Sequence, residues 1–118
     1  VTHLLVNAFE AAALEAETGT ALADLPVQVV VVTRGAEGAD WISADDHFHA
    51  PAFPVEAVDT TGAGDCFAGS LAAAIDQGMT AEQAIRFASA AAALHVTRPG
   101  TAEAMPDYHE VDVFLASQ

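Results

Sequence analysis

The chain has 118 residues, of which 53% are hydrophobic, so it can build one small domain with a core and is too apolar for a disordered segment. Its formal net charge of −14, from 17 acidic and 3 basic residues, argues against nucleic acid and anionic membranes as partners. The single cysteine, Cys66, excludes an internal disulfide and suits a reducing compartment, so we expect a cytoplasmic protein. No apolar run reaches the length of a membrane span.

The first half of the chain predicts strands interrupted by one helix. Residues 3–6 form a short apolar strand, and the helix after it is capped by Asn7, with Glu10 at the capping-box position, and ends at Gly19. A β-branched run then predicts a buried parallel strand, and a turn leads into a short hairpin or two edge strands. These strands are expected at residues 27–33, 39–44 and 46–50.

The second half of the chain predicts three helices. Gly78 stops the first of them, and capping residues open the other two. The helices are expected at residues 63–77, 80–96 and 107–116. Strands that alternate with helices indicate a layered α/β sheet.

The segment from Val58 to Phe67, with the sequence Val-Asp-Thr-Thr-Gly-Ala-Gly-Asp-Cys-Phe, is the most informative part of the chain. Its glycines permit a tight turn, and the N–H groups at the start of the following helix can hold an anion. Asp65 lies in the first turn of that helix. An anion site beside a carboxylate is what phosphoryl transfer to a hydroxyl requires. The structural alternative is a turn chosen for its shape and an Asp that only complements the helix dipole.

The ten-residue segment closely resembles the C-terminal signature of the ribokinase-like (PfkB) carbohydrate kinases. It does not fit the Walker A pattern, because the chain has no lysine. The resemblance extends from Asn7 to the last helix and implies a three-layer α/β/α ribokinase-like fold. Members of the family are more than twice as long, so we expect residues 1–118 to be the C-terminal, nucleotide-binding portion, with the N-terminal sugar-binding half absent.

The resemblance implies roles for the residues of the signature. Asp65 would accept the proton of the acceptor hydroxyl and would mainly orient it, because a helix N-terminus makes a carboxylate a weak base. The N–H groups of Gly62, Ala63 and Gly64 would form an anion hole for the transferred phosphoryl group. Cys66, which follows the catalytic Asp, is expected to be a small packed residue rather than a nucleophile.

Two further motifs resemble the nucleotide site of the family. Asn7 and Glu10 match an Asn-x-x-Glu motif that orders the phosphates and magnesium-bound water, although the same spacing is an ordinary capping box. Thr33, Gly35 and Gly38 match a Thr-x-Gly-x-x-Gly turn over ATP, for which a plain strand-to-strand turn is the alternative.

Some positions near these motifs depart from the family or invite a simpler interpretation. Ser89 stands where other members have a histidine beside the adenine. Arg34, in the turn, could contact phosphate but is expected to be solvated. His47 and His49 alternate along a predicted strand and are expected on a solvated face.

The resemblance also implies a potassium site built on oxygen atoms. Asp59 and the carbonyl of Thr61 would contribute the first ligands, and an Asx-type turn is the alternative for Asp59. The remaining ligands would come from a later loop, at His95, Arg98, Gly100 and Ala104. Other members tend to carry serine where Ala104 stands, which puts one of these ligands in doubt.

These observations predict ATP-dependent phosphoryl transfer to a hydroxyl of a sugar or a sugar-like molecule, with ATP, Mg²⁺ and K⁺ as cofactors. The expected partners are the sugar, and either a second copy of the chain or a complementing N-terminal segment. Two alternatives stay open. The chain could be a nucleotide-binding fragment without catalysis, or a structural domain whose glycines only shape turns.

Overall fold

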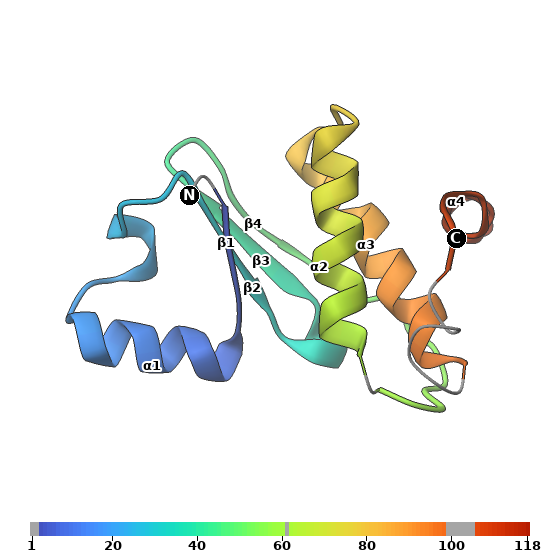
Figure 1. Ribbon diagram of the computed structural model, residues 1–118, viewed down its shortest axis with the longest axis horizontal. Helices are drawn as coiled ribbons and strands as arrows, with labels where there is room; N and C mark the ends of the chain where they lie inside the picture. The colour runs from blue at the N-terminus through green and yellow to red at the C-terminus, as the bar shows by residue number, and fades with distance from the viewer. Residues whose placement is uncertain (1–2, 61, 99–105) are drawn as a thin grey trace. The chain divides into compact units, whose positions relative to one another are not determined.

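The computed structural model describes residues 3–60, 62–98 and 106–118 (Figure 1). The chain divides into two compact units, Val1–Pro51 and Ala52–Gln118. The first unit contains the strands β1 (His3–Asn7), β2 (Val29–Thr33), β3 (Ala39–Ser43) and β4 (His47–Ala50), and the helix α1 (Ala8–Thr18). The second unit contains the helices α2 (Ala63–Asp76), α3 (Ala81–Val96) and α4 (Tyr108–Ala116).

The first unit is a four-stranded mixed sheet in the order β1-β2-β3-β4. β1 and β2 run parallel, joined through α1, and β2, β3 and β4 pair antiparallel. Val30 and Val32 of β2 are buried together with Ala11 of α1 and Leu22, and this cluster is the core on one face of the sheet. Each fully buried valine contributes about 1.5–3 kcal/mol relative to an exposed one.

The strand predicted at residues 27–33 begins two residues later, at Val29. Pro26 has no N–H to offer a neighbouring strand, and the Val27 N–H donates to the carbonyl of Leu25 (2.8 Å) in a tight turn. The hairpin of β3 and β4 confirms the prediction for residues 39–50. Two short 3₁₀ turns, Leu22–Asp24 and Gly35–Glu37, were not predicted.

An aromatic row occupies the other face of the sheet. Trp41 of β3 stacks on Phe48 of β4, with ring centroids 6.1 Å apart, and the ring of His3 meets Trp41 edge-on at 6.0 Å. Trp41 and Phe48 are direct register partners, so the stacking is a cross-strand pair that stabilises the hairpin.

In the second unit, α2 and α3 pack against each other as an antiparallel hairpin (Figure 1). Gly78 makes the turn between them in the left-handed conformation (φ 85°), which favours glycine. Ala84, Ala88 and Ala91 of α3 are completely buried, and their small side chains let the neighbouring backbone approach closely. The helices predicted at residues 63–77 and 80–96 are thereby confirmed to within about one residue.

α4 packs on α3 through aromatic rings. Tyr108 lies 5.2 Å from Phe87, and Phe114 meets Phe53 edge-on at 5.3 Å, while the guanidinium of Arg86 lies 5.0 Å from the centre of the Phe53 ring. These contacts also anchor the irregular segment that contains Phe53. Within the described part of the chain, no helix is long and apolar enough to cross a membrane.

Candidate functional site

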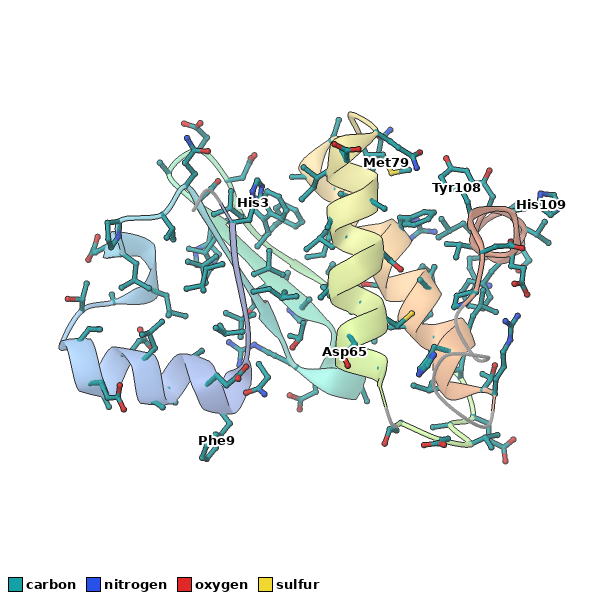
Figure 2. The ribbon with its side chains drawn as sticks, viewed as in Figure 1. His3, Phe9, Asp65, Met79, Tyr108 and His109 are labelled. Carbon is teal, nitrogen blue, oxygen red and sulfur yellow. The ribbon has the colours of Figure 1, made fainter. Side chains whose placement is uncertain are left out.

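The signature segment forms the start of α2. Gly62 is its N-cap in the left-handed conformation (φ 78°), which a residue with a Cβ adopts only with strain. The Ala63 N–H donates to the carbonyl of Thr60 (3.2 Å), and the Cys66 N–H donates to that of Gly62 (2.9 Å). Asp65 lies in the first turn with its side chain exposed, as Figure 2 shows. The structure therefore brings Gly62, Ala63, Gly64 and Asp65 together at one helix end.

Gly64 has a different reason to be glycine. Its φ is not positive, and a Cβ built on it would meet nothing within 4 Å. Neither the backbone conformation nor the packing of the described residues requires glycine here. Gly64 is exposed in the first turn of the helix, where N–H groups have no intrahelical acceptor.

The N-terminus of α2 also differs from the other helix starts. α1, α3 and α4 each begin with a complete capping box, formed by Asn7 with Glu10, Thr80 with Gln83, and Asp107 with Glu110. Within the described residues, no side chain caps α2. Apart from the Ala63 N–H, which donates to the carbonyl of Thr60, the first turn of α2 lacks, among the described residues, the side-chain cap that the other three helices have.

The Asn7 and Glu10 motif is a capping box in this structure. The Glu10 N–H donates to Asn7 Oδ1 (2.7 Å), and the Asn7 N–H donates to Glu10 Oε1 (2.9 Å). Both residues are exposed, and Phe9 between them is 84% exposed and projects away from α1 (Figure 2).

The turn from Thr33 to Gly38 follows β2. The Arg34 N–H donates to the carbonyl of Gly38 (2.8 Å), and the Gly38 N–H donates to that of Gly35 (3.1 Å). Gly35 (φ 57°) and Gly38 (φ 99°) both have positive φ, so the shape of the turn requires glycine at these two positions.

The two motifs of the first unit lie at one edge of its sheet. Asn7, the last residue of β1, is the register partner of Thr33, the last residue of β2. Because these strands are parallel, the start of α1 and the glycine turn both follow the carboxyl ends of neighbouring strands. Ligands of open α/β sheets bind outside the carboxyl ends of the strands, which is where these two motifs lie.

Arg34 and His49 are exposed, as predicted, and both also pair with Asp40, which was not predicted. Arg34 Nε donates to Asp40 Oδ2 (2.8 Å), and His49 Nδ1 lies 2.6 Å from Asp40 Oδ1. Partial burial of Asp40 opposes its ionisation, but the hydrogen bonds and charges of His49 and Arg34 outweigh this effect and lower the pKa of the carboxyl. The side chains of Arg34 and His49 are still 38% and 49% exposed, so each is both paired and accessible to water.

Three of the six expected cation-binding residues, Asp59, His95 and Arg98, lie at or beside the end of α3. The N–H groups of Val58 and Asp59 both donate to the carbonyl of Val96, at 2.6 and 3.0 Å, which fixes Asp59 beside this helix end. His95 is completely buried, and the Arg98 side chain pairs with Glu110 of α4. The other expected ligands, Thr61, Gly100 and Ala104, lie outside the described residues.

Two buried residues of the second unit have their polar groups turned inward. The Ser89 hydroxyl donates to the carbonyl of Ile85 (2.8 Å), one turn earlier in α3. Cys66 is buried, as expected for a packed residue, and this burial outweighs a hydrogen bond with Ser70 and raises the pKa of its thiol. Among the residues that the structure describes, no three His, Cys, Asp or Glu side chains cluster as a metal site would require.

Comparison with known proteins shows the family to which the chain belongs. The sequence pattern of the pfkB family carbohydrate kinases matches residues 1–108. The chain belongs to this family. It is 39% identical over 117 residues to ribokinase of Bacillus subtilis (98% of this chain, 40% of the relative), and 39% identical over 95 residues to deoxyribokinase of Salmonella typhi (80% and 31%). The chain therefore spans less than half the length of these relatives.

The solved structures of pfkB-family proteins confirm the fold. The crystal structure of a putative ribokinase II from E. coli in complex with ATP and Mg²⁺ superposes with a TM-score of 0.90 at 34% identity, covering 100% of this chain and 40% of that one. The ribokinase-like α/β fold predicted from the sequence is therefore correct.

The ion pairs of two acidic residues of this pfkB-family chain escaped the sequence analysis. Asp40 lies between Arg34 and His49, and Glu110 both caps α4 and pairs with Arg98. The segment from Asp107 to Glu110 was predicted to cap the last helix, and the capping box confirms this, but the spacing gives no sign of the pair with Arg98. No local signal marks Asp40, because its partners come together only through the pairing of β3 with β4.

Proposed function

We propose that the chain carries the ATP site, the anion hole and the catalytic carboxylate of a kinase that transfers the γ-phosphoryl group of ATP to a hydroxyl of a sugar or a sugar-like molecule. The observation that supports this most is the start of α2. Asp65 is exposed there beside uncapped N–H groups, and Gly64 leaves a space that the described residues do not fill.

The anion hole consists of the N–H groups of Gly62, Ala63 and Gly64. In the transition state, negative charge spreads over the oxygens of the transferred group, and helix N-terminal N–H groups stabilise it. The Ala63 N–H has a bond of 3.2 Å to Thr60, at the long end of the normal range, so a phosphate oxygen can replace it at small cost.

Asp65 orients the acceptor hydroxyl and receives its proton. Phosphoryl transfer is loose in most analyses, with little bond formation to the nucleophile, so a weak base in the right position is sufficient. Its exposed position in the first turn of α2 places the carboxylate next to the anion hole.

ATP and magnesium bind at the carboxyl edge of β1 and β2. The turn formed by Thr33, Gly35 and Gly38 covers the nucleotide, and Asn7 and Glu10 order the phosphates and the water bound to magnesium. This fits the chemistry of the ion, which keeps several waters and needs one or two carboxylates. Capping uses one oxygen of Glu10, and a carboxylate has further lone pairs for a bound water.

The adenine is placed near Ser89 of α3, the position at which other members of the family carry a histidine. The Ser89 hydroxyl already donates to the carbonyl of Ile85, so we expect it to contribute shape rather than a hydrogen bond to the base.

Potassium binds between Asp59 and the loop after α3, with oxygen ligands from Asp59, Thr61, His95, Arg98, Gly100 and Ala104. The shared carbonyl of Val96 supports this arrangement, because it holds Asp59 at the end of α3. An ion there neutralises part of the charge of a strongly acidic chain close to the anion hole.

The acceptor is a small sugar. The names of two relatives, ribokinase and deoxyribokinase, favour a pentose. Its contacts come mainly from residues outside this chain, supplied by a complementing N-terminal segment or by a second copy. Use of ATP and a single free thiol fit a cytoplasmic location.

Calorimetric titration of the chain with magnesium-ATP, with and without potassium, tests the proposal. We expect weak binding that potassium strengthens, and an Asp65→Ala variant that binds nearly as well, since Asp65 serves the acceptor. ADP release with a panel of pentoses and hexoses tests transfer. Binding without transfer would favour the nucleotide-binding fragment, and a folded chain that does not bind would favour a scaffold.

A further inference from the structure

Asp40 joins three elements of the first unit. It lies on β3, and each of its carboxylate oxygens has its own partner. Oδ2 accepts from Nε of Arg34 in the turn after β2 (2.8 Å), and Oδ1 lies 2.6 Å from Nδ1 of His49 on β4. The side chain of Asp40 is only 19% exposed, so the carboxylate is partly shielded from water.

Arg34, one of the two partners of Asp40, also closes the turn from Thr33 to Gly38. The Arg34 N–H donates to the carbonyl of Gly38 (2.8 Å), and its carbonyl accepts from the N–H of Glu37 (3.1 Å). The turn contains Gly35 and Gly38, which have more conformations to lose on ordering than other residues. The backbone hydrogen bonds of Arg34 are one restraint on this turn. The ion pair between the Arg34 side chain and Asp40 of β3 is a second restraint and therefore limits the conformations of the turn further.

The residues around Asp40 leave Arg34 and His49 as the partners of its carboxylate. Its neighbour on β2 is Val32, which is apolar and completely buried, so the carboxylate cannot find a polar partner on that side. On β4 it faces His49, and His47 lies two residues further along the same side of the strand. Arg34 and Glu37 are the charged residues of the turn itself.

We propose that Asp40 is a positioning residue, which holds the Thr33–Gly38 turn through Arg34 in the shape that receives the nucleotide, with His49 orienting its carboxylate. This inference rests on the proposed function, because it assigns nucleotide binding to the turn. It adds a residue that does not itself touch ATP.

The test compares Asp40→Asn with the matched control Asp45→Asn. Asp45 lies exposed in the connection between β3 and β4, and its substitution removes the same charge. Two quantities are measured, the hydrogen exchange rates of the Arg34 and Gly38 amides and the dissociation constant of magnesium-ATP. For Asp40→Asn we expect faster exchange at both amides and about threefold weaker binding, the range of a partly exposed ion pair. The control should change neither quantity.

A double-mutant cycle shows whether Asp40 acts through Arg34. In an Arg34→Gln background, Asp40→Asn should have little further effect on the dissociation constant. Additive effects would overturn the proposed route. A lower melting temperature of Asp40→Asn with unchanged exchange and unchanged affinity would assign Asp40 to stability alone and overturn the inference.

The two proposals fail in distinguishable ways. If the wild-type chain binds magnesium-ATP and Asp40→Asn binds it equally well, the inference fails and the proposed function stands. If the wild-type chain does not bind, both are overturned.

Discussion

The starts of α1 and α2 both resemble a motif of the pfkB family, yet they are built in opposite ways. At α1, Asn7 and Glu10 close the helix with two reciprocal hydrogen bonds, at 2.7 and 2.9 Å. At α2, Gly62 opens the helix in a left-handed conformation, and no described side chain caps it.

The difference between the two helix starts shows which of these residues the fold itself requires. At α1 the capping box and the proposed magnesium role use the same two side chains, so either requirement alone accounts for them. At α2 the fold accounts for Gly62 through its backbone conformation but not for Gly64, beside which there is open space. The proposed anion hole would account for Gly64, and the two alanine substitutions below test this.

The largest effect is expected from Asp65→Asn. The proposed acceptor of the hydroxyl proton is lost, so the rate of phosphoryl transfer should fall by about 10²–10⁴-fold. The affinity for magnesium-ATP should change by less than about twofold, because the nucleotide does not depend on this side chain. ADP release in the presence of a sugar gives the rate, and Asp76→Asn, at the other end of α2, is the matched control. An undiminished rate would show that Asp65 only complements the helix dipole.

Gly64→Ala should separate binding from folding. The added methyl group meets no protein atom, and alanine is the better helix former, so the free energy of unfolding should rise by up to about 1 kcal/mol. Binding of magnesium-ATP should weaken about tenfold or more, because the methyl group would enter the proposed phosphate site.

Gly69→Ala is the control for Gly64→Ala. Gly69 lies in the same helix, and its Cβ would also meet nothing within 4 Å. This variant should gain stability and keep its affinity. If Gly64→Ala also keeps its affinity, the comparison between the two helix starts loses its functional meaning.

At α1, in contrast to Gly64→Ala, a substitution in the capping box should lower the stability of the fold. Asn7→Ala removes a cap and should lower the free energy of unfolding by about 1 kcal/mol. Thr80→Ala at the start of α3 should do the same, and Thr80 is a capping residue for which no nucleotide contact is proposed. Glu10→Gln keeps the capping box and should leave stability nearly unchanged. Because it removes the charge, it should raise the magnesium concentration needed for ATP binding. Chemical denaturation and titration at several magnesium concentrations measure the two effects, and an unchanged magnesium requirement would leave Glu10 with the cap alone.

The smallest effect concerns the pH dependence of stability at Asp40. Its pKa is lowered in the folded state, so near that pKa the unfolded chain binds more protons than the folded one. The stabilisation is fully present above about pH 4, the ordinary range of Asp, and is lost as the pH falls through the lower value. Wild type and Asp40→Asn should differ by about 0.2–1 kcal/mol at neutral pH and converge in acid. A difference that persists below the folded pKa would contradict the ion-pair explanation.

Local signals made most of the secondary structure predictable. Capping boxes and left-handed glycines fix the ends of α1, α2 and α3, because each signal acts within one helical turn. The parallel β2 was recognisable from its valines, although its first residue was misplaced, because the turn at Leu25 and Val27 leaves no mark except Pro26.

Those parts of the candidate site that are formed by residues close together in the sequence were predictable. The start of α2 and the turn after β2 are of this kind. The ion pairs of Asp40 were not predictable, because they require the register that places it opposite His49. The hydrogen bond between Asp59 and Val96 joins residues 37 positions apart. Only the family resemblance, which groups Asp59 with His95 and Arg98, indicated that these two segments meet.

The chain contains one tryptophan and one tyrosine, and they belong to different units. Trp41 is packed between His3 and Phe48 in the sheet, and Tyr108 lies against Phe87 at the start of α4. Each unit therefore has its own optical reporter. Tryptophan emission follows the melting of the sheet, and the tyrosine band in near-ultraviolet circular dichroism follows that of the helices. Coincident transitions would identify one cooperative unit, and separate ones two.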